Sequence, residues 1–129
     1  MLFKEQEKKT TTRKARRFPE DDLQIAVAFY LNYKNATWFH VPNERKTTNQ
    51  AGYRLKQKGV KAGVPDVMVL DKRKGFSGLA IELKVKPNKV STEQTAWLEK
   101  LNAIGYKTAI CWTFDEAMVL IDWYYKKDA

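Results

Sequence analysis

Two short apolar segments joined by a polar connection constrain this chain more than any other feature. Residues 66–70 read DVMVL and residues 79–85 read LAIELKV, and each has the length and the aliphatic content of a strand. The eight residues between them, DKRKGFSG, carry the glycines and charges of a hairpin connection. The pattern therefore predicts two neighbouring antiparallel strands.

The rest of the chain alternates between helical and extended patterns. A helix is predicted to start at Pro19, ahead of three acids and the segment LQIAVAFYLNY, which is apolar on most sides and is expected to be well buried. Further strands are predicted over 37–41 and 107–112. Further helices are predicted over 49–57, 91–105 and 114–125. This order predicts an α/β fold, a mixed central β-sheet flanked by helices, in a single domain over residues 18–129.

Positive charge gathers in two blocks of the sequence. The net charge is +9, of which residues 1–17 and residues 44–61 supply +5 each, so the remainder nets −1. Two such blocks favour contact with a polyanion over a general solubility role. The first block is predicted to be a flexible basic arm. The second supplies candidate DNA contacts, for which solvated surface side chains are the alternative: Arg45, Lys46, Arg54, Lys56, Lys58 and Lys61.

Pro65-Asp66, at the start of one strand, and Glu82-Leu83-Lys84, in the next, carry the candidate chemistry. Side chains alternate between the two faces of a strand, so Glu82 and Lys84 are expected to point one way while their apolar neighbours face the core. Pairing of the two strands would bring Asp66 close to Glu82. The alternative interpretation is a surface hairpin that carries an aspartate and a Glu–Lys pair.

Two carboxylates held this close repel each other, and a divalent cation between them would remove the repulsion. The predicted cofactor is Mg²⁺ or Mn²⁺, because two carboxylates and the Leu83 carbonyl are the oxygen ligands that such ions prefer. A bound ion polarises a phosphate oxygen and lowers the pKa of a bound water. Lys84 beside it would orient that water and stabilise charge on the phosphate. These residues therefore predict hydrolysis of phosphodiester bonds.

Longer motifs around these residues resemble one nuclease family. Residues 55–66 read LKQKGVKAGVPD, residues 78–84 read GLAIELK, residues 91–98 read STEQTAWL, and residues 105–106 read GY. Over residues 20–125 the chain resembles the virus-type replication-repair nuclease (VRR-NUC) domain of the PD-(D/E)XK superfamily, in its stand-alone phage and bacterial form. The resemblance implies a restriction-endonuclease-like core. It also implies a metal-dependent endonuclease that leaves 5′-phosphate and 3′-hydroxyl ends on DNA.

The resemblance assigns roles to individual residues. It implies Glu20 as a third acidic ligand, with a helix-start acid favoured by the helix dipole as the alternative. It implies that Gln94 contacts the attacking water or the phosphate, with a capping box from Ser91 as the alternative, and geometry is expected to allow only one of these. The candidate catalytic residues are thus Asp66, Glu82, Lys84, Gln94 and Glu20. The candidate metal ligands are Glu20, Asp66, Glu82 and Leu83.

Two further polar residues lie near the predicted strand over 37–41. His40 is the single histidine of the chain and is expected to be structural, because the sequence shows no orienting partner for a catalytic histidine. Asn43 follows in a polar stretch, where the family pattern implies contact with DNA and a simple turn residue is the alternative.

The preferred prediction is a structure-specific endodeoxyribonuclease that acts on branched DNA, such as four-way (Holliday) junctions, as a homodimer. A nuclease for flaps, nicks or linear ends is one alternative, and a non-catalytic nucleic-acid-binding protein is another. Trp123, Tyr124 and Tyr125 form a candidate exposed patch for the dimer. No small-molecule cofactor or membrane attachment is expected. A cytoplasmic location is expected, since no secretory signal is present and Cys111 has no second cysteine to pair with.

Overall fold

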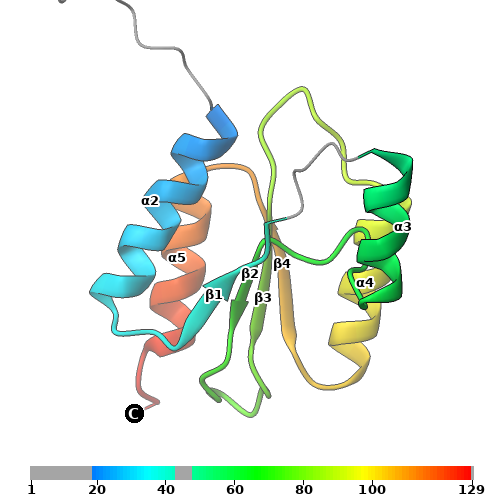
Figure 1. Cartoon of the computed structure of the whole chain (residues 1–129). Helices are drawn as coiled ribbons and strands as arrows, with labels where there is room; N and C mark the ends of the chain where they lie inside the picture. The colour runs from blue at the N-terminus through cyan, green and yellow to red at the C-terminus, as the bar shows by residue number, and fades with distance from the viewer. Residues whose placement is uncertain (1–18, 43–47, 129) are drawn as a thin grey trace, which may run out of the picture.

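The described part of the chain, residues 19–42 and 48–128, forms a four-stranded sheet with helices on both sides (Figure 1). In this computed structural model the strands are β1 (Trp38–His40), β2 (Val67–Val69), β3 (Leu79–Leu83) and β4 (Lys107–Cys111). The helices are α2 (Pro19–Tyr33), α3 (Asn49–Gln57), α4 (Thr92–Ala103) and α5 (Phe114–Tyr125). The predicted α/β class with a mixed sheet is confirmed. The predicted basic arm over 1–17 lies outside the described residues.

The strands follow one another across the sheet in the order β1-β2-β3-β4. β2 runs antiparallel to β1 and to β3, with Val67 opposite Ile81, whereas β3 runs parallel to β4. The predicted antiparallel pair of strands is therefore confirmed. Continued by one residue beyond Val67 and Ile81, this register sets Asp66 opposite Glu82.

Side-chain alternation along the central strands divides the core between the two faces of the sheet. The larger cluster packs against α2 and α5 and contains Val67, Val69, Leu79, Ile81 and Leu83. The smaller cluster packs against α4 and contains Met68, Ala80 and Leu101. The same alternation turns Glu82 toward the α4 side. Figure 1 shows α2 beside α5 on one side of the sheet, and α3 beside α4 on the other.

Helix α2 buries only one stripe, so the expectation that it would be buried on most sides is wrong. Leu23, Val27 and Leu31 are buried, and their spacing of four residues matches one face of a helix. Ile25 and Phe29, also four residues apart, are 65% and 77% exposed. The physical reason is that α2 lies at the outside of the fold, where the sheet and α5 cover one face of it.

Tyr124 and Tyr125 are held in place by hydrogen bonds and are not exposed. The prediction of an exposed aromatic patch at residues 123–125 is therefore wrong. The side chain of Tyr124 is fully buried, and its hydroxyl donates to the Asp71 carbonyl at 2.6 Å. The Tyr125 hydroxyl donates to Asp71 Oδ2 at 2.6 Å. Asp71 Oδ2 also accepts the Thr37 amide at 2.9 Å, so this one residue ties α5 to the start of β1. Of the three aromatic residues only Trp123 is exposed, over 41% of its surface.

Cys111 is buried in the core at the end of β4 as an unpaired cysteine, as the sequence predicted. Burial raises the pKa of its thiol to about 11, which keeps the side chain neutral. Across residues 19–42 and 48–128, no helix has both the length and the apolar composition that crossing a bilayer requires.

Candidate active site

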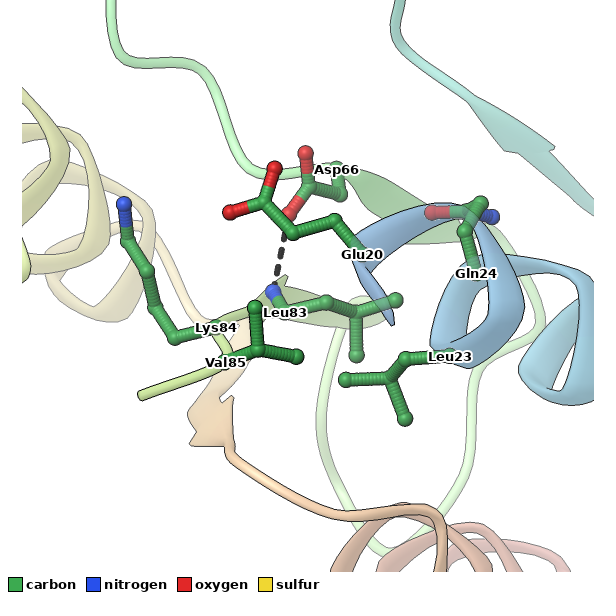
Figure 2. Close-up of a pocket in the computed structure, with 7 residues that line it drawn as sticks. All are labelled: Glu20, Leu23, Gln24, Asp66, Leu83, Lys84 and Val85. Carbon is green, nitrogen blue, oxygen red and sulfur yellow. Dashed lines mark hydrogen bonds between the residues drawn. The ribbon is translucent and has the colours of Figure 1, made fainter. Parts of the chain in front are cut away.

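The carboxylate of Asp66 lies at the end of the sheet where β2 begins and β3 ends. Its Oδ2 atom accepts the main-chain amide of Leu83 at 2.8 Å, which fixes the side chain against the neighbouring strand (Figure 2). Burial raises the pKa of Asp66 above its ordinary value, because a partly desolvated carboxylate is less stable than the neutral acid. The predicted approach of Asp66 to Glu82 is present, since each carboxyl group perturbs the pKa of the other.

Glu82 is the buried acid of the site. Only 2% of its surface is exposed, and its Oε2 atom accepts a hydrogen bond from Gln94 Nε2 at 2.9 Å. Its Oε1 atom is buried and has no hydrogen-bond partner among the residues that the structure describes. Burial, together with the nearby charge of Asp66, raises the pKa of Glu82 to about 8. A buried acceptor without a partner is rare in folded proteins and calls for a specific explanation.

A divalent cation fits this pair of carboxylates. It would give Glu82 Oε1 the partner that it lacks and would offset the repulsion between Asp66 and Glu82. Mg²⁺ is commonly bound through one or two protein carboxylates, with waters and substrate phosphates completing its shell. In the part of the chain that the structure describes, no three side chains of the His, Cys, Asp or Glu type are grouped closely enough to hold a metal.

Glu20 and Lys84 line one pocket with Asp66, at the start of α2. The same pocket is lined by Leu23, Gln24, Leu83 and Val85. In Figure 2 the carboxyl group of Glu20 points toward Asp66, whereas the side chain of Lys84 extends away from Asp66 to the other side of the view. The structure thus brings four of the predicted site residues to one pocket, namely Glu20, Asp66, Leu83 and Lys84, whereas Glu82 does not line it. The role of Glu20 as a metal ligand stays a prediction.

Glu20 has a hydrogen-bond partner that no sequence pattern predicts. Its Oε1 atom accepts a hydrogen bond from Asn88 Nδ2 at 2.5 Å. Asn88 lies in the connection between β3 and α4, 68 residues away in sequence. Such a contact depends on tertiary structure alone, and no local motif would have identified it.

Gln94 performs two tasks with the two ends of one amide. Its Oε1 accepts the Ser91 main-chain amide at 2.9 Å, and Ser91 Oγ accepts the Gln94 amide at 3.1 Å, so the capping box is complete. Its Nε2 meanwhile donates to Glu82. The capping alternative is therefore present, and the same amide also contacts Glu82, whereas contact of Gln94 with the attacking water or the phosphate stays a prediction. The amide carries an acceptor and a donor at opposite ends, and each faces a different partner.

Gly63 lets the chain that leads to Asp66 lie directly against the start of α4. Its φ is +82°, in the left-handed region that glycine tolerates. A Cβ atom at this position would lie 2.7 Å from the main-chain carbon of Glu93 and 2.8 Å from the nitrogen of Gln94. The turn at residues 63–65 was predicted, whereas its close approach to α4 was not. This approach holds Asp66 beside the helix that supplies Gln94.

His40 supports the site from β1. Its Nδ1 atom lies 2.8 Å from the Asp66 carbonyl oxygen, which also accepts the Val41 amide at 2.9 Å. No orienting partner for this histidine could be identified from side chains in the sequence, because the partner is a main-chain carbonyl just before the neighbouring strand β2. The contact agrees with the structural role predicted for His40.

The candidate DNA contacts divide between described and undescribed parts of the chain. Arg54 and Lys56 lie on α3, Lys58 caps its end, and Lys61 follows, and all four side chains are exposed. Asn43, Arg45 and Lys46 lie outside the described residues.

The fold and site together define an α/β protein of the nuclease class, with paired carboxylates and a lysine on adjoining strands. Residues 18–114 match the VRR-NUC domain, and the chain belongs to that family. A solved structure described as a VRR_NUC domain protein has a TM-score of 0.71 and 24% identity, and the match covers 86% of this chain and 91% of that one. Another, described as a VRR_NUC domain, has a TM-score of 0.55 and 19% identity over 82% and 97% of the two chains. No curated protein matches.

Proposed function

We propose that this protein is a Mg²⁺- or Mn²⁺-dependent endonuclease that hydrolyses phosphodiester bonds in DNA. The observation that carries the proposal is the buried Oε1 atom of Glu82, which has no hydrogen-bond partner within residues 19–42 and 48–128. Glu82 lies in β3, which pairs with the strand that Asp66 precedes. Membership of a nuclease family supports the reaction class. The exposed basic residues around α3 support a nucleic-acid substrate.

The residues of the chain have distinct roles in this proposal. Asp66, Glu82, the Leu83 carbonyl and Glu20 would hold the cation. When bound, the cation would polarise the scissile phosphate and lower the pKa of a water. Lys84 would orient the attacking water and stabilise the negative charge that develops on the phosphate. Gln94 keeps Glu82 in place through the 2.9 Å hydrogen bond, while the Leu83 amide keeps Asp66 in place.

Branched DNA, such as a four-way junction, is the substrate that we favour, with the protein acting as a homodimer. A two-fold dimer carries two equivalent sites, which suits paired cuts across a symmetric junction. Flaps, nicks and linear ends are the competing substrates. A panel of labelled DNA structures separates them, and light scattering measures the oligomeric state. A monomer that still cut junctions symmetrically would contradict the dimer.

The decisive experiment compares cleavage of a four-way junction and a linear duplex by wild type, Lys84→Ala and Lys100→Ala. Lys100 is an exposed lysine on α4 outside the site, so its loss removes the same charge without touching the chemistry. We expect Lys84→Ala to abolish cutting and to leave binding nearly intact, and Lys100→Ala to behave as wild type. Equal cutting by both variants would remove Lys84 from the mechanism. Tight binding by wild type without cutting in either metal would favour the non-catalytic alternative.

A further inference from the structure

Helix α3 takes no part in the hydrophobic core. None of its residues is buried, and Tyr53 is 65% exposed. Its ends are closed locally, since Thr48 Oγ1 accepts the Ala51 amide at 3.2 Å and the Lys58 amide donates to the Arg54 carbonyl at 3.0 Å. A helix that is polar on its surface and contributes nothing to the core needs another reason for its composition.

One face of α3 carries a row of hydrogen-bonding side chains. These side chains line a shallow hollow in the surface. They are Asn49, Gln50, Tyr53, Arg54 and Gln57. Their spacing of one, four, five and eight residues from the first places them on the same side of a helix. Amide and guanidinium side chains are the groups that pair with base edges in the major groove of DNA, which is wide enough to admit an α-helix.

The charge of this segment selects a polyanionic partner. Residues 49–61 contain four basic side chains and no acidic one, a net charge of +4. The basic residues extend from the helix into the turn that follows it, where they would meet phosphates on either side of a groove. An acidic protein would neutralise the positive charge of this segment. It would not offer a matching pattern of donors and acceptors to the amide side chains of α3.

The position of α3 in the chain also fits a single DNA duplex that reaches the active site. Lys58 lies eight positions before Asp66 in the sequence, so the two Cα atoms lie at most about 28 Å apart. One turn of B-form DNA is about 34 Å long. The packing of Gly63 against α4 fixes part of this connection. A duplex that presents a phosphate to Asp66 would therefore present a groove to α3 within one helical turn.

We propose that α3 enters the major groove of double-stranded DNA beside the bond that is cut. The substrate class rests on the proposed function, to which this adds a duplex and a groove. Gln50 and Arg54 contact base edges, while Lys56, Lys58 and Lys61 contact phosphates. Every base pair has a purine N7 acceptor in the major groove, so this contact requires no sequence preference.

The test measures binding by fluorescence anisotropy in EDTA, which prevents cleavage. The probes are a DNA duplex, the same duplex with all purines replaced by 7-deazapurines, and an RNA duplex of the same sequence. Replacement by 7-deazapurines removes acceptors in the major groove only. We expect wild type to lose about 10-fold in affinity for the 7-deaza duplex, the scale of one lost base contact. We expect RNA to bind more weakly, because its major groove is too narrow for a helix.

Matched variants separate α3 from general charge. Arg54→Ala is compared with Arg73→Ala, since Arg73 is an exposed arginine in the connection between β2 and β3, at the other end of the sheet. Gln50→Ala tests the base contact without changing charge. We expect Arg54→Ala and Gln50→Ala to weaken binding to normal DNA about 5-fold or more and to reduce sensitivity to the 7-deaza change. Arg73→Ala is expected to retain both affinity and sensitivity.

Any one of the following results would overturn the inference. They are equal affinity for the normal and 7-deaza duplexes, equal behaviour of Arg54→Ala and Arg73→Ala, and RNA binding as tight as DNA binding. A variant that changed only the salt dependence would show phosphate contact alone and would also overturn it. Cleavage is a separate measurement. A protein that never cut but showed the full 7-deaza effect would refute the proposed function and leave this inference standing.

Discussion

Replacing Gly63 by alanine tests how the chain brings Asp66 to the active site. The added Cβ atom would lie 2.7 Å from the main-chain carbon of Glu93 and 2.8 Å from the nitrogen of Gln94. Neither main-chain atom can move without disturbing the first turn of α4. The segment that leads to Asp66 must therefore separate from α4, or α4 must shift away from Glu82.

The expected loss of stability has two parts. The first is the cost of a side chain at a φ of +82°, about 1–2 kcal/mol for a residue other than glycine. The second is the cost of forcing an extra carbon into a filled space, about 1–3 kcal/mol. Together they predict that Gly63→Ala lowers the free energy of unfolding by about 2–5 kcal/mol.

Gly75 provides a control that isolates the second part. Its φ is +81°, almost the same as at Gly63, but a Cβ atom there would meet no heavy atom within 4 Å. Gly75→Ala should therefore lose only the backbone part, about 1–2 kcal/mol. Urea unfolding followed by circular dichroism measures both variants, and calorimetry with Mn²⁺ measures the site. Equal unfolding free energies for Gly63→Ala and Gly75→Ala, with unchanged metal uptake, would refute the packing argument.

Three more predictions follow from single contacts. In metal-free protein, the free energy of unfolding should fall between about pH 5 and pH 8. The reason is that the pKa of Glu82 is about 8 in the folded protein, so the native state holds a proton that the unfolded state has lost. Urea unfolding should show that Glu82→Gln flattens this fall. Asp71→Ala should cost about 1–3 kcal/mol in the same assay, since Tyr125 loses its half-buried hydrogen-bond acceptor. Asn88→Ala should weaken Mn²⁺ binding about 10-fold in calorimetry, because Glu20 loses the donor that orients it.

Controls and contrary outcomes differ for the three. A wild-type stability that is flat from pH 5 to pH 8 in EDTA would contradict the protonated state of Glu82. Asp128→Ala removes a carboxylate that is 79% exposed from its ion pair with Lys74 and should cost less than about 1 kcal/mol. An equal loss for Asp71→Ala would contradict its anchoring role. Lys89→Ala, next in sequence to Asn88, should leave Mn²⁺ affinity unchanged. Parallel losses for these two variants would show that the loop responds to any substitution and that the bond from Asn88 to Glu20 has no specific role.

Local patterns predicted most of the fold because each element has a signal within its own segment. The alternation around Ile81 identified β3, and Pro19 with the following acids identified the start of α2. The approach of Asp66 to Glu82 was also predicted, because pairing of the two hairpin strands places these residues opposite each other. The burial of α2 was predicted wrongly, because a run of apolar residues does not say how many neighbours will cover it.

The supporting contacts of the site could not be predicted from local patterns. The bond from Asn88 to Glu20, the approach of Gly63 to α4 and the histidine bond to the Asp66 carbonyl all join segments that are distant in sequence. The double role of Gln94 was missed for a different reason. Its capping spacing is a local signal, but its second partner lies on β3, and only the tertiary structure shows that one amide reaches both.

The shared amide of Gln94 couples a helix end to an acid. A movement of the Glu82 carboxylate would displace the Gln94 side chain, because the two are hydrogen-bonded. The same Gln94 side chain closes the first turn of α4. The opening of that turn, read as hydrogen exchange at the amides of residues 91–95, will therefore report on the charge state of the carboxylate. Hydrogen exchange at the beginning of α4 thus measures a change in protonation on β3.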